Sequence, residues 1–398
     1  MKFTNKKVVF LAIFFQICAF SNVFAQDQKV EEKDVMDYFH KVVHKNKTVK
    51  HDSSSLDKGK ILFSALPAAG YSLTTNFAVN LAANVAFKRP NATLSVFTMA
   101  PTLTSRKQIL LPIRGTVWTK NNKYNAVFDW RLMKYPQSTF GLGSQSKLSN
   151  EYPMDYSYLR LYQTVYKKIV GHLFAGVGYH YDNHWNISID LPNNMNHYDV
   201  YYLGIAQKSV SSGLSLNLLF DNRESSIYPE EGLYLNANLR KNFTLLGSNY
   251  ESTSLITDVR KYIKFPAYSE NVLAFWNFNW LTIKGKVPYL DLPSTGWDMF
   301  TNTARGYIQG RLRGYNYLYA ESEYRFSLTR NKFLGGVVFS NVQAISDNTQ
   351  LSFKRLLPGV GLGLRFKVNK LSKTNLGLDY GFGVEGSRGL FLNIGEVF

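Results

Sequence analysis

The sequence predicts an all-β protein, a transmembrane antiparallel β-barrel of about 16 strands, an even number typical of closed bacterial barrels. Apolar and polar residues alternate with a period of two over most of the chain after residue 70, as in strands that face lipid on one side and a polar lumen on the other. Aromatic residues make up 15% of the chain, which suits the aromatic girdles of such barrels. No segment after residue 25 has the ~20 consecutive apolar residues that a membrane-spanning helix needs.

The N-terminus predicts a signal peptide over residues 1–25. Three lysines within the first seven residues form a positive head, residues 8–20 are an apolar run, and Val23-Phe24-Ala25 precedes a cleavage position. A retained membrane anchor is the alternative, but the run is short and Gln16 interrupts it. We therefore expect export, and for a β-barrel this means the outer membrane of a Gram-negative bacterium.

Cysteine content and net charge limit the ligands and partners that the chain can have. The single cysteine, Cys18, lies inside the expected signal peptide, so the mature chain has no thiol for a disulfide or a metal. Lysine and arginine number 46 against 28 acidic residues. The basic residues are scattered among strands without a nucleic-acid-binding motif, so we expect no nucleic acid partner. Outer-membrane lipid and lipopolysaccharide, with their phosphates, are the expected partners of this charge.

Residues 26–69 form a short, polar segment that we expect in the periplasm and that is too small for a core of its own. Val35, Tyr38 and neighbouring apolar residues can line one face of a short helix. His40 and His44 are four residues apart, a spacing that can ligate zinc on a helix. No glutamate stands where a metalloprotease needs one, so we expect a polar helix face and no metal.

The barrel itself is predicted over residues 70–398. In the stretch 214–221, Leu214, Leu216 and Leu218 share one face, and residues 361–368 and 375–385 alternate in the same way. A soluble β-sandwich would also alternate. However, the polar faces here carry charged residues and glycines, and the strands approach the ~11 residues of a tilted membrane strand.

The alternating runs set the expected strands. Residues 183–211 leave room for one further pair. We expect strands at residues 73–88, 92–104, 108–119, 123–134, 138–144, 155–168, 171–182, 212–222, 232–243, 250–264, 270–283, 315–329, 332–345, 357–368, 373–385 and 388–398.

The C-terminal stretch RGLFLNIGEVF reads as a last strand that ends in an aromatic residue. Counting back from Phe398 by twos places Ile394, Leu392 and Leu390 on one face, with Glu396 as the departure. A terminal aromatic residue on an alternating last strand resembles the signal by which outer-membrane barrels are recognised for insertion. Phe398 is therefore the expected insertion signal.

A turn motif lies in FDNRESSIYPEEG, residues 220–232. Asp221 and Arg223 end a strand on its polar side, and Pro229 with Gly232 makes a turn. Here the chain resembles the BamA/TamA superfamily of outer-membrane barrels, the bacterial surface antigen family, whose barrels carry an Asp-x-Arg and Pro-x-x-Gly turn. Physically, the motif is an ordinary hairpin turn.

The glycine-rich stretch ARGYIQGRLRGY, residues 304–315, carries the second resemblance. In that superfamily a long loop before the twelfth strand bears Val-Arg-Gly-Phe/Tyr and folds back into the lumen. Arg305, Gly306 and Tyr307 match it, with Ala304 in place of valine, and residues 312–315 (LRGY) are a second match. A Glu-x-Arg pair follows on the next strand, which is the twelfth expected. The resemblance thus implies a long loop folded into the lumen.

Arg305 inside a barrel would need an anion, because an unpaired buried guanidinium is costly. Alternation places Glu321, Glu323 and Asp379 on the lumen side, and we expect Arg305 to pin the loop through one of them, with Asp379 favoured. A solvated loop with no fixed partner is the alternative, and there the arginine would add almost nothing to stability.

The neighbours of Arg305 complete the motif. Gly306 lets the backbone turn and approach the wall, and Tyr307 is expected to pack against the lumen with its hydroxyl bonded. Many family members place an aspartate partner on the thirteenth strand. This chain has Ser340 and Asn341 there, so the same partner does not carry over.

The resemblance implies a function. Family members insert barrel proteins into the outer membrane or move polypeptides across it, generally with periplasmic POTRA domains that receive clients. This chain reads as a short form without POTRA domains. We expect a role in outer-membrane protein or lipid biogenesis or translocation, through a weak seam between the first and last strands or a loop-gated lumen. Periplasmic or outer-membrane assembly proteins are candidate partners.

Two other functions stay open. One is a passive pore or structural surface protein with the same fold. The other is an outer-membrane enzyme, which we do not expect, because no nucleophile elbow, phosphate loop or dinucleotide fingerprint is present. His180, Asp182 and His184 lie at an expected strand end and read as a loop rather than a metal site. We expect no catalytic residue, no metal and no cofactor.

Overall fold

The computed structural model describes residues 31–35, 37–38, 61–72, 74–190, 207–370 and 373–398. The expected signal peptide, most of the segment 26–69 and the histidine pair His40 and His44 lie outside the described residues. The chain divides into two compact units, Met1–Glu32 and Lys33–Phe398. Everything below concerns the second unit.

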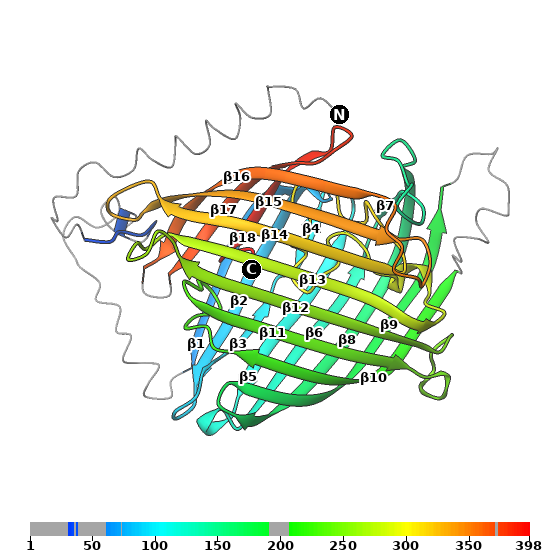
Figure 1. Ribbon diagram of the computed structural model, residues 1–398, viewed down its shortest axis with the longest axis horizontal. Coiled ribbons are helices and arrows are strands. Elements are labelled where there is room, and N and C mark those ends of the chain that lie inside the picture. Colours follow the sequence, from blue (N-terminus) through cyan, green and yellow to red (C-terminus); the bar gives the residue numbers. More distant parts are fainter. Residues whose placement is uncertain (1–30, 36, 39–60, 73, 191–206, 371–372) are drawn as a thin grey trace, which may run out of the picture. The chain divides into compact units, whose positions relative to one another are not determined.

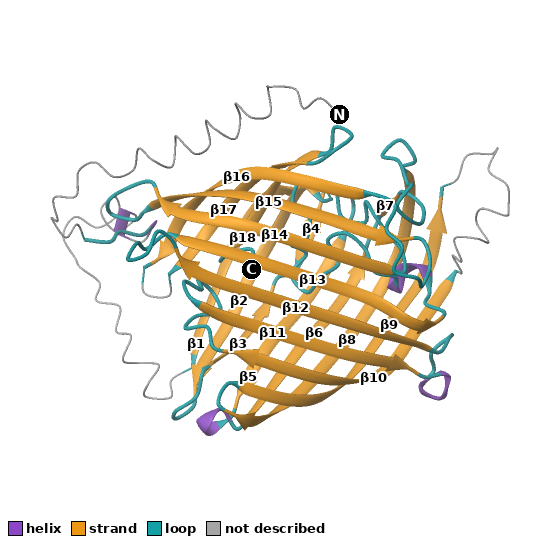
Figure 2. Ribbon diagram, in the orientation of Figure 1, coloured by secondary structure: helices purple, strands orange, loops and turns teal. Residues whose placement is uncertain are grey.

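The described residues form one antiparallel sheet in which strands follow one another in chain order, with loops gathered at the two ends (Figure 2). The short 3-10 turns are Lys120–Asn122, Thr244–Leu246 and Tyr289–Asp291. No helix within the described ranges is long and apolar enough to cross a membrane. The strands are β1 (Leu62–Ser72), β2 (Asn76–Lys88), β3 (Leu94–Met99), β4 (Thr102–Thr104), β5 (Ile109–Trp118), β6 (Tyr124–Lys134), β7 (Gln137–Thr139), β8 (Tyr152–Val170), β9 (Leu173–Ile189), β10 (Lys208–Asp221), β11 (Gly232–Asn242), β12 (Ser252–Lys264), β13 (Val272–Gly285), β14 (Asn316–Ser327), β15 (Leu334–Ser346), β16 (Leu356–Asn369), β17 (Thr374–Phe382) and β18 (Arg388–Ile394).

Two strands of the wall are each divided into two segments, β3 with β4 and β6 with β7. β3 and β4 both pair with β2 and with β5, and β6 and β7 both pair with β8. When each interrupted pair is counted once, the 18 segments of the described sheet become 16 wall strands, and β14 is the twelfth. The predicted fold class and the predicted placement of β14 are therefore confirmed.

The sheet curves around until its first and last strands lie side by side (Figure 1). A Cβ atom built on Gly70 of β1 would lie 2.7 Å from Leu392 Cδ1 of β18. Each other pair of neighbouring wall strands is joined by a backbone ladder, but no ladder joins β1 to β18 among the described residues. We call this junction the seam.

Burial in the wall is inverted relative to a soluble protein. In β10, Leu214, Leu216 and Leu218 are 52%, 63% and 55% exposed, whereas the intervening Ser215 and Asn217 are 3% and 4% exposed. Water would disfavour this arrangement, because leucine gains free energy from leaving water and serine and asparagine do not. The outer face therefore suits hydrocarbon, and the polar face lines the lumen.

The strand boundaries differ from the prediction in three places. β1 was not predicted, because its small residues and Pro67 hide the alternation: the first expected strand, residues 73–88, corresponds to β2, and the sheet begins at Leu62 rather than at residue 70. A proline without an N–H is tolerated on a strand at the edge of a ladder. The expected strand at 138–144 is reduced to β7. Residues 183–211 hold the ends of β9 and β10, and the rest of that stretch lies outside the described residues.

The last strand is also shorter than expected, since β18 ends at Ile394 and not at Phe398. Gly395 has φ of 88°, a conformation that favours glycine, and the chain turns inward there. Phe398 is buried and its ring lies 5.2 Å from that of Trp276 on the lumen side. Glu396, the departure from the apolar face, bonds Arg365 instead of facing lipid. The role of Phe398 as an insertion signal stays a prediction.

Candidate functional site

Residues 286–315, which we call the plug loop, connect β13 to β14 and are packed among other residues rather than solvated. Arg305, Arg311, Leu312 and Arg313 are all at most 1% exposed. The loop holds its own shape through Asp298, whose carboxylate accepts hydrogen bonds from several backbone N–H groups, including that of the residue at position 303, at 2.8 Å. It also pairs Ser294 with Arg313 in an isolated bridge.

Arg305 of the plug loop contacts all three carboxylates named from the sequence. Its Nη1 donates to Asp379 Oδ2 of β17 at 2.5 Å, and its Nη2 contacts both Glu321 and Glu323 of β14. Its guanidinium carbon also lies 3.7 Å from the centre of the Phe339 ring. Burial alone lowers the pKa of Arg305, but the three carboxylates outweigh it and hold the pKa well above its ordinary value.

Two wall arginines share these carboxylates. Arg325 Nε donates to Glu323 Oε1 at 2.6 Å, and Arg365 Nη1 donates to Asp379 Oδ1 at 2.5 Å. Arg365 Nε also donates to Glu396 Oε2, the residue just after β18, at 2.8 Å. The group, which we call the Arg305 cluster, therefore joins the plug loop to β14, β16, β17 and the segment after β18. Its members are Arg305, Arg325, Arg365, Glu321, Glu323, Asp379 and Glu396.

The backbone beside Arg305 is also held. Asn341 on β15, the thirteenth wall strand, donates from Nδ2 to the Arg305 carbonyl at 3.0 Å. Gly306 has φ of 104°, and a Cβ atom there would lie 2.9 Å from the carbonyl carbon of Phe382. The close approach to β17 and the positive φ both require glycine. Tyr307 donates from its hydroxyl to the Pro358 carbonyl at 2.5 Å.

The other two arginines of the plug loop, Arg311 and Arg313, bond to loop residues and not to the wall strands. Arg313, in the second match to the motif, donates from Nη1 to the carbonyls of Tyr289 and Leu290 at 3.1 Å each, so it braces the loop against itself. Arg311 donates to Ser146 and to Glu385 Oε2 at 2.7 Å, so it ties the plug loop to two neighbouring loops. Only Arg305 reaches the carboxylates of the wall strands.

The turn motif after β10 is compact. Arg223 donates from Nε and Nη2 to the two carboxylate oxygens of Asp221 at 2.9 and 2.8 Å, a bidentate pair. Gly232 has φ of 115°, and a Cβ atom there would lie 2.9 Å from Arg223 Cα. The Pro229 carbonyl accepts a long bond of 3.5 Å from Arg325. The turn thus lies beside the Arg305 cluster.

Comparison with known proteins decides the family. The sequence model of the Omp85 superfamily domain matches residues 175–389, more than half of the chain. The chain belongs to the Omp85 superfamily. It is accordingly a β-barrel protein of the outer membrane of a Gram-negative bacterium. No protein with a curated description matches the chain in sequence.

Two solved structures resemble this Omp85 chain in fold. BamA from Haemophilus ducreyi lacking POTRA domains 1–3 matches with a TM-score of 0.55 and 14% identity, over 84% of this chain and 70% of that one. CdiB from Acinetobacter baumannii matches with a TM-score of 0.53 and 13% identity, over 84% of this chain and 59% of that one. Identities this low show the fold alone. Within the described ranges, no residues of this Omp85 chain form a POTRA domain.

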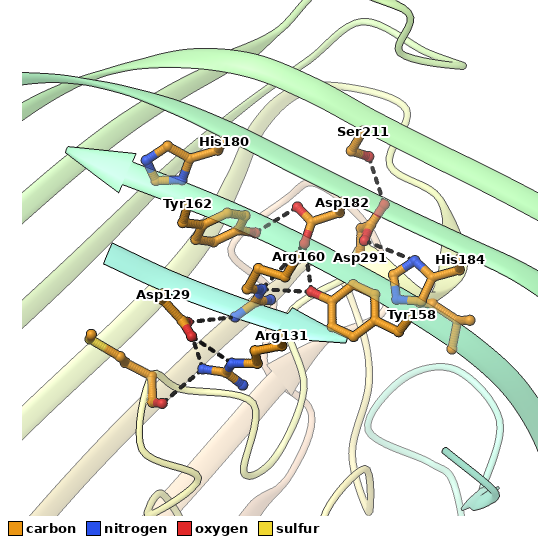
Figure 3. A network of polar contacts seen from close by, with 12 residues as sticks. Asp129, Arg131, Tyr158, Arg160, Tyr162, His180, Asp182, His184, Ser211 and Asp291 are labelled. Atoms are coloured by element: carbon orange, nitrogen blue, oxygen red, sulfur yellow. Dashed lines mark hydrogen bonds and ion pairs between the residues drawn. The ribbon is translucent and has the colours of Figure 1, made fainter. Parts of the chain in front are cut away.

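A second polar group in the Omp85 barrel was not predicted from the sequence (Figure 3). His180, Asp182 and His184 were expected at a strand end, but they lie inside β9 and face the lumen, because β9 continues to Ile189. Asp182 accepts hydrogen bonds from Arg240 at 2.8 Å, Tyr158 at 2.5 Å and Tyr162 at 2.6 Å. No group of acidic, histidine or cysteine residues in the described part of the chain is arranged to hold a metal ion.

The plug loop contributes Asp291 to this second group, which we call the Asp182 network. Ser211 of β10 donates to Asp291 Oδ2 at 2.6 Å, and His184 Nδ1 lies 3.5 Å from Oδ1 (Figure 3). Burial and the nearby Asp182 raise the pKa of Asp291 to about 7. The members of the Asp182 network are Asp129, Arg131, Tyr158, Arg160, Tyr162, His180, Asp182, His184, Ser211, Arg240 and Asp291.

The sequence does contain one signal for this network, namely acidic residues and arginines spaced two apart within a strand. Asp129 and Arg131 are two residues apart on β6, which places both on the lumen face, and they form a bidentate pair at 2.7 and 2.6 Å. Asp258 and Arg260 on β12 repeat the pattern. Acid-x-arginine pairs within alternating strands therefore mark the lumen face of this chain.

Proposed function

We propose that this Omp85 barrel inserts barrel proteins into the outer membrane, or moves polypeptides or lipids across it, by opening the seam between β1 and β18. The observation that carries the proposal is the missing ladder at the seam. A single backbone hydrogen bond contributes about 1 kcal/mol net, so a ladder of several bonds resists opening and an unladdered junction does not. A client strand could pair with the free edge of β1 or β18.

The composition of β1 supports the same proposal. Pro67 has no N–H to donate to a neighbour, and Gly70 leaves only a side-chain contact with Leu392. The facing pairs on either side of the seam are complete: β1 pairs with β2 over its whole length, and β17 pairs with β18. The weakest line of the wall is therefore the seam.

The plug loop supports gating over a passive pore. The buried Arg305 cluster ties the loop to four parts of the wall, so a steadily open lumen would need several charged contacts to break. A passive pore of the same fold predicts large and steady conductance in planar bilayers. We propose instead that the filled lumen gives low conductance and that clients use the seam.

The remaining parts of the proposal concern export and partners. We propose that residues 1–25 direct export, that outer-membrane lipid and lipopolysaccharide surround the barrel, and that periplasmic or outer-membrane assembly proteins deliver clients. We propose a translocation or assembly factor and not an enzyme, without a cofactor.

The experiment locks the seam. In the double variant Gly70→Cys with Leu392→Cys, the two Cβ atoms would lie about 3.9 Å apart, within the range for a disulfide. The matched control is Leu239→Cys with Leu255→Cys, which are register partners within the β11–β12 ladder. Insertion of a small test barrel into liposomes that carry the protein is measured in the oxidised and reduced states.

We expect the oxidised seam variant to lose insertion, a reductant to restore it, and the control to insert in both states. If the oxidised seam variant inserts as fast as the reduced one, the seam is not the route. If neither reduced protein inserts the test barrel and both give large conductance in planar bilayers, the passive pore replaces the proposal.

A further inference from the structure

A small cavity lies between the plug loop and the wall, and several members of the Asp182 network, among them Asp182 and Ser211, line it. Trp297 and Asp291 of the plug loop line it on one side, and Arg160, Arg240 and Thr282 line it from the wall. It leaves about 30 Å³ in which the centre of a water molecule can move. This is room for an ion or a few water molecules and not for a sugar or a peptide.

Two buried donors in the lining have no partner. Trp297 Nε1 and Thr282 Oγ1 make no hydrogen bond to any described residue, and the two side chains are 7% and 1% exposed. By contrast, the buried Trp276 donates from Nε1 to Asp258 at 2.9 Å. An unpaired buried donor costs free energy, so a lining with two of them calls for a bound acceptor.

Charge in the lining favours an anion as that acceptor. Arg160 Nε donates to the Tyr158 hydroxyl at 2.6 Å, but the guanidinium reaches the carboxylates of Asp182 and Asp129 only at 3.3 and 3.5 Å. Both carboxylates are held more closely by other arginines, Asp182 by Arg240 at 2.8 Å and Asp129 by Arg131 at 2.6 Å. The nearby charged side chains are Arg114, Arg131, Arg160, Arg240, Asp129, Asp182 and Asp291. In the lining itself, Arg160 and Arg240 stand against Asp182 and Asp291. Burial and Asp182 raise the pKa of Asp291 to about 7, so below that pH its carboxyl is largely protonated, arginine charge is in surplus, and a cation is disfavoured.

We propose that this cavity binds a small inorganic anion of halide size, held by the Arg160 guanidinium, the Trp297 indole N–H and the Thr282 hydroxyl. Each of these groups donates to the anion, and the anion neutralises the surplus arginine charge. Since Trp297 belongs to the plug loop and Arg160 and Thr282 belong to the wall, the anion links the two. The site does not depend on the seam, and it stands or falls separately from the proposed function.

The test uses the full chain in detergent with bromide as the probe. Crystals grown in bromide should show an anomalous peak within hydrogen-bonding distance of Arg160 and Trp297. In solution, bromide and chloride should raise the temperature at which the folded form converts to the unfolded form, relative to gluconate at equal ionic strength. Gluconate is too large for the cavity.

The variants Trp297→Phe and Thr282→Val each remove one donor and keep most of the side-chain volume. Together they should raise the bromide concentration for half-maximal stabilisation about tenfold or more. Trp130→Phe is the matched control, because Trp130 Nε1 donates to Gln163 elsewhere on the wall. The absence of an anomalous peak in the wild-type cavity would overturn the proposal, as would a bromide effect that the double variant leaves unchanged. If the double variant fails to fold, the wild-type anomalous map decides.

Discussion

The Arg305 cluster and the Asp182 network are both buried polar groups of the lumen, yet they are balanced differently. The Arg305 cluster has three arginines and four carboxylates, and its bonds are short, such as 2.5 Å from Arg365 to Asp379. The Asp182 network has three arginines and three aspartates, of which Asp291 has its pKa raised to about 7 and is largely protonated below that pH, and Arg160 reaches two carboxylates only at 3.3 and 3.5 Å. The first group leaves Arg305 Nε unpaired, whereas the cavity beside the second group is lined by two unpaired donors, those of Trp297 and Thr282.

This difference indicates that the Arg305 cluster holds the plug loop in place and that the region of the Asp182 network can bind a ligand. A buried charged group is tolerated when its partners satisfy it fully, and it becomes costly once a partner is removed. In the Arg305 cluster every carboxylate bonds at least one arginine, although Arg305 Nε has no hydrogen-bond partner among the described residues. Beside the Asp182 network, the cavity lining leaves the Trp297 and Thr282 donors unpaired, so this region depends on what fills the cavity. Removing one member should therefore affect the two groups unequally.

The largest effect is expected for Arg305→Ala. It leaves Glu321, Glu323 and Asp379 buried with less positive charge, and breaking a buried pair in this way costs about 3–5 kcal/mol. Because the plug loop loses its wall contact, the folded barrel should convert to the unfolded form at a lower temperature in semi-native gel electrophoresis. The conversion temperature of Arg305→Lys should lie between those of Arg305→Ala and the wild type, since lysine keeps the charge but not the forked geometry of the guanidinium.

The control for this prediction is Arg330→Ala, an exposed arginine in the turn between β14 and β15. Surface substitutions of this kind usually change stability by less than about 0.5 kcal/mol. A conversion temperature for Arg305→Ala equal to that of the control would show that Arg305 does not hold the loop.

A smaller effect is expected for Asp182→Asn. The amide removes the charged acceptor of Arg240, Tyr158 and Tyr162, and hydrogen bonds to a charged group contribute about 1.5–3 kcal/mol. The loss should be smaller than that of Arg305→Ala, because Arg240 keeps other acceptors such as the Asn242 side chain at 2.7 Å. The same gel assay measures it.

Asp155→Asn is the matched control for that comparison, because Asp155 is 42% exposed in its side chain and reaches Lys134 only at 3.7 Å. It should leave the conversion temperature unchanged. If Asp182→Asn destabilises the barrel more than Arg305→Ala does, the ranking of the two groups is reversed, and the Asp182 network is the main support of the plug loop.

Most of the wall could be predicted from the sequence, because strand alternation is local and a period of two is visible in residues such as Leu214, Leu216 and Leu218. The exceptions are the places where local chemistry departs from that period. Pro67 and small residues hide β1, which lies at the seam. Gly395 and Glu396 turn the chain inward, and the charged Glu396 on an apolar face was the available signal.

The site was less accessible to sequence reasoning. Alternation places Glu321, Glu323 and Asp379 on the lumen face, so their availability to Arg305 follows from the pattern. That all three meet one guanidinium depends on how the closed wall brings β14 beside β15, β16 and β17. The Asp182 network draws residues from five strands and the plug loop, and Asp182 and Asp291 are far apart in the chain. No local sequence pattern links Asp182 to Asp291, although the spacing of Asp129 and Arg131 indicates the lumen face of β6.

The smallest effect should appear as a pH dependence of the plug loop. The pKa of Asp291 is raised from its ordinary 3.8 to about 7, chiefly by burial and then by Asp182. The folded state therefore holds this proton more tightly than the unfolded state. The resulting stability is complete below about pH 4 and is lost as the pH rises from there to about 7. Asp347, in the loop after β15, has a lowered pKa, so its contribution to stability depends on pH in the opposite direction. Burial raises its pKa, but Lys354 and the N–H and hydroxyl of Ser144 together lower it by more, so its contribution to stability is lost as the pH falls.

Conversion temperatures measured from pH 5 to pH 8 should fall for the wild type, and Asp291→Asn should flatten the fall because the amide does not titrate. Asp347→Asn should leave the fall unchanged in this range, since the carboxyl of Asp347 is ionised throughout it. A slope that survives Asp291→Asn would mean that another group of the lumen titrates. The contrast between the two lumen groups would then rest on geometry alone, because the long contacts of Arg160 and the unpaired donors beside it do not depend on the protonation of Asp291.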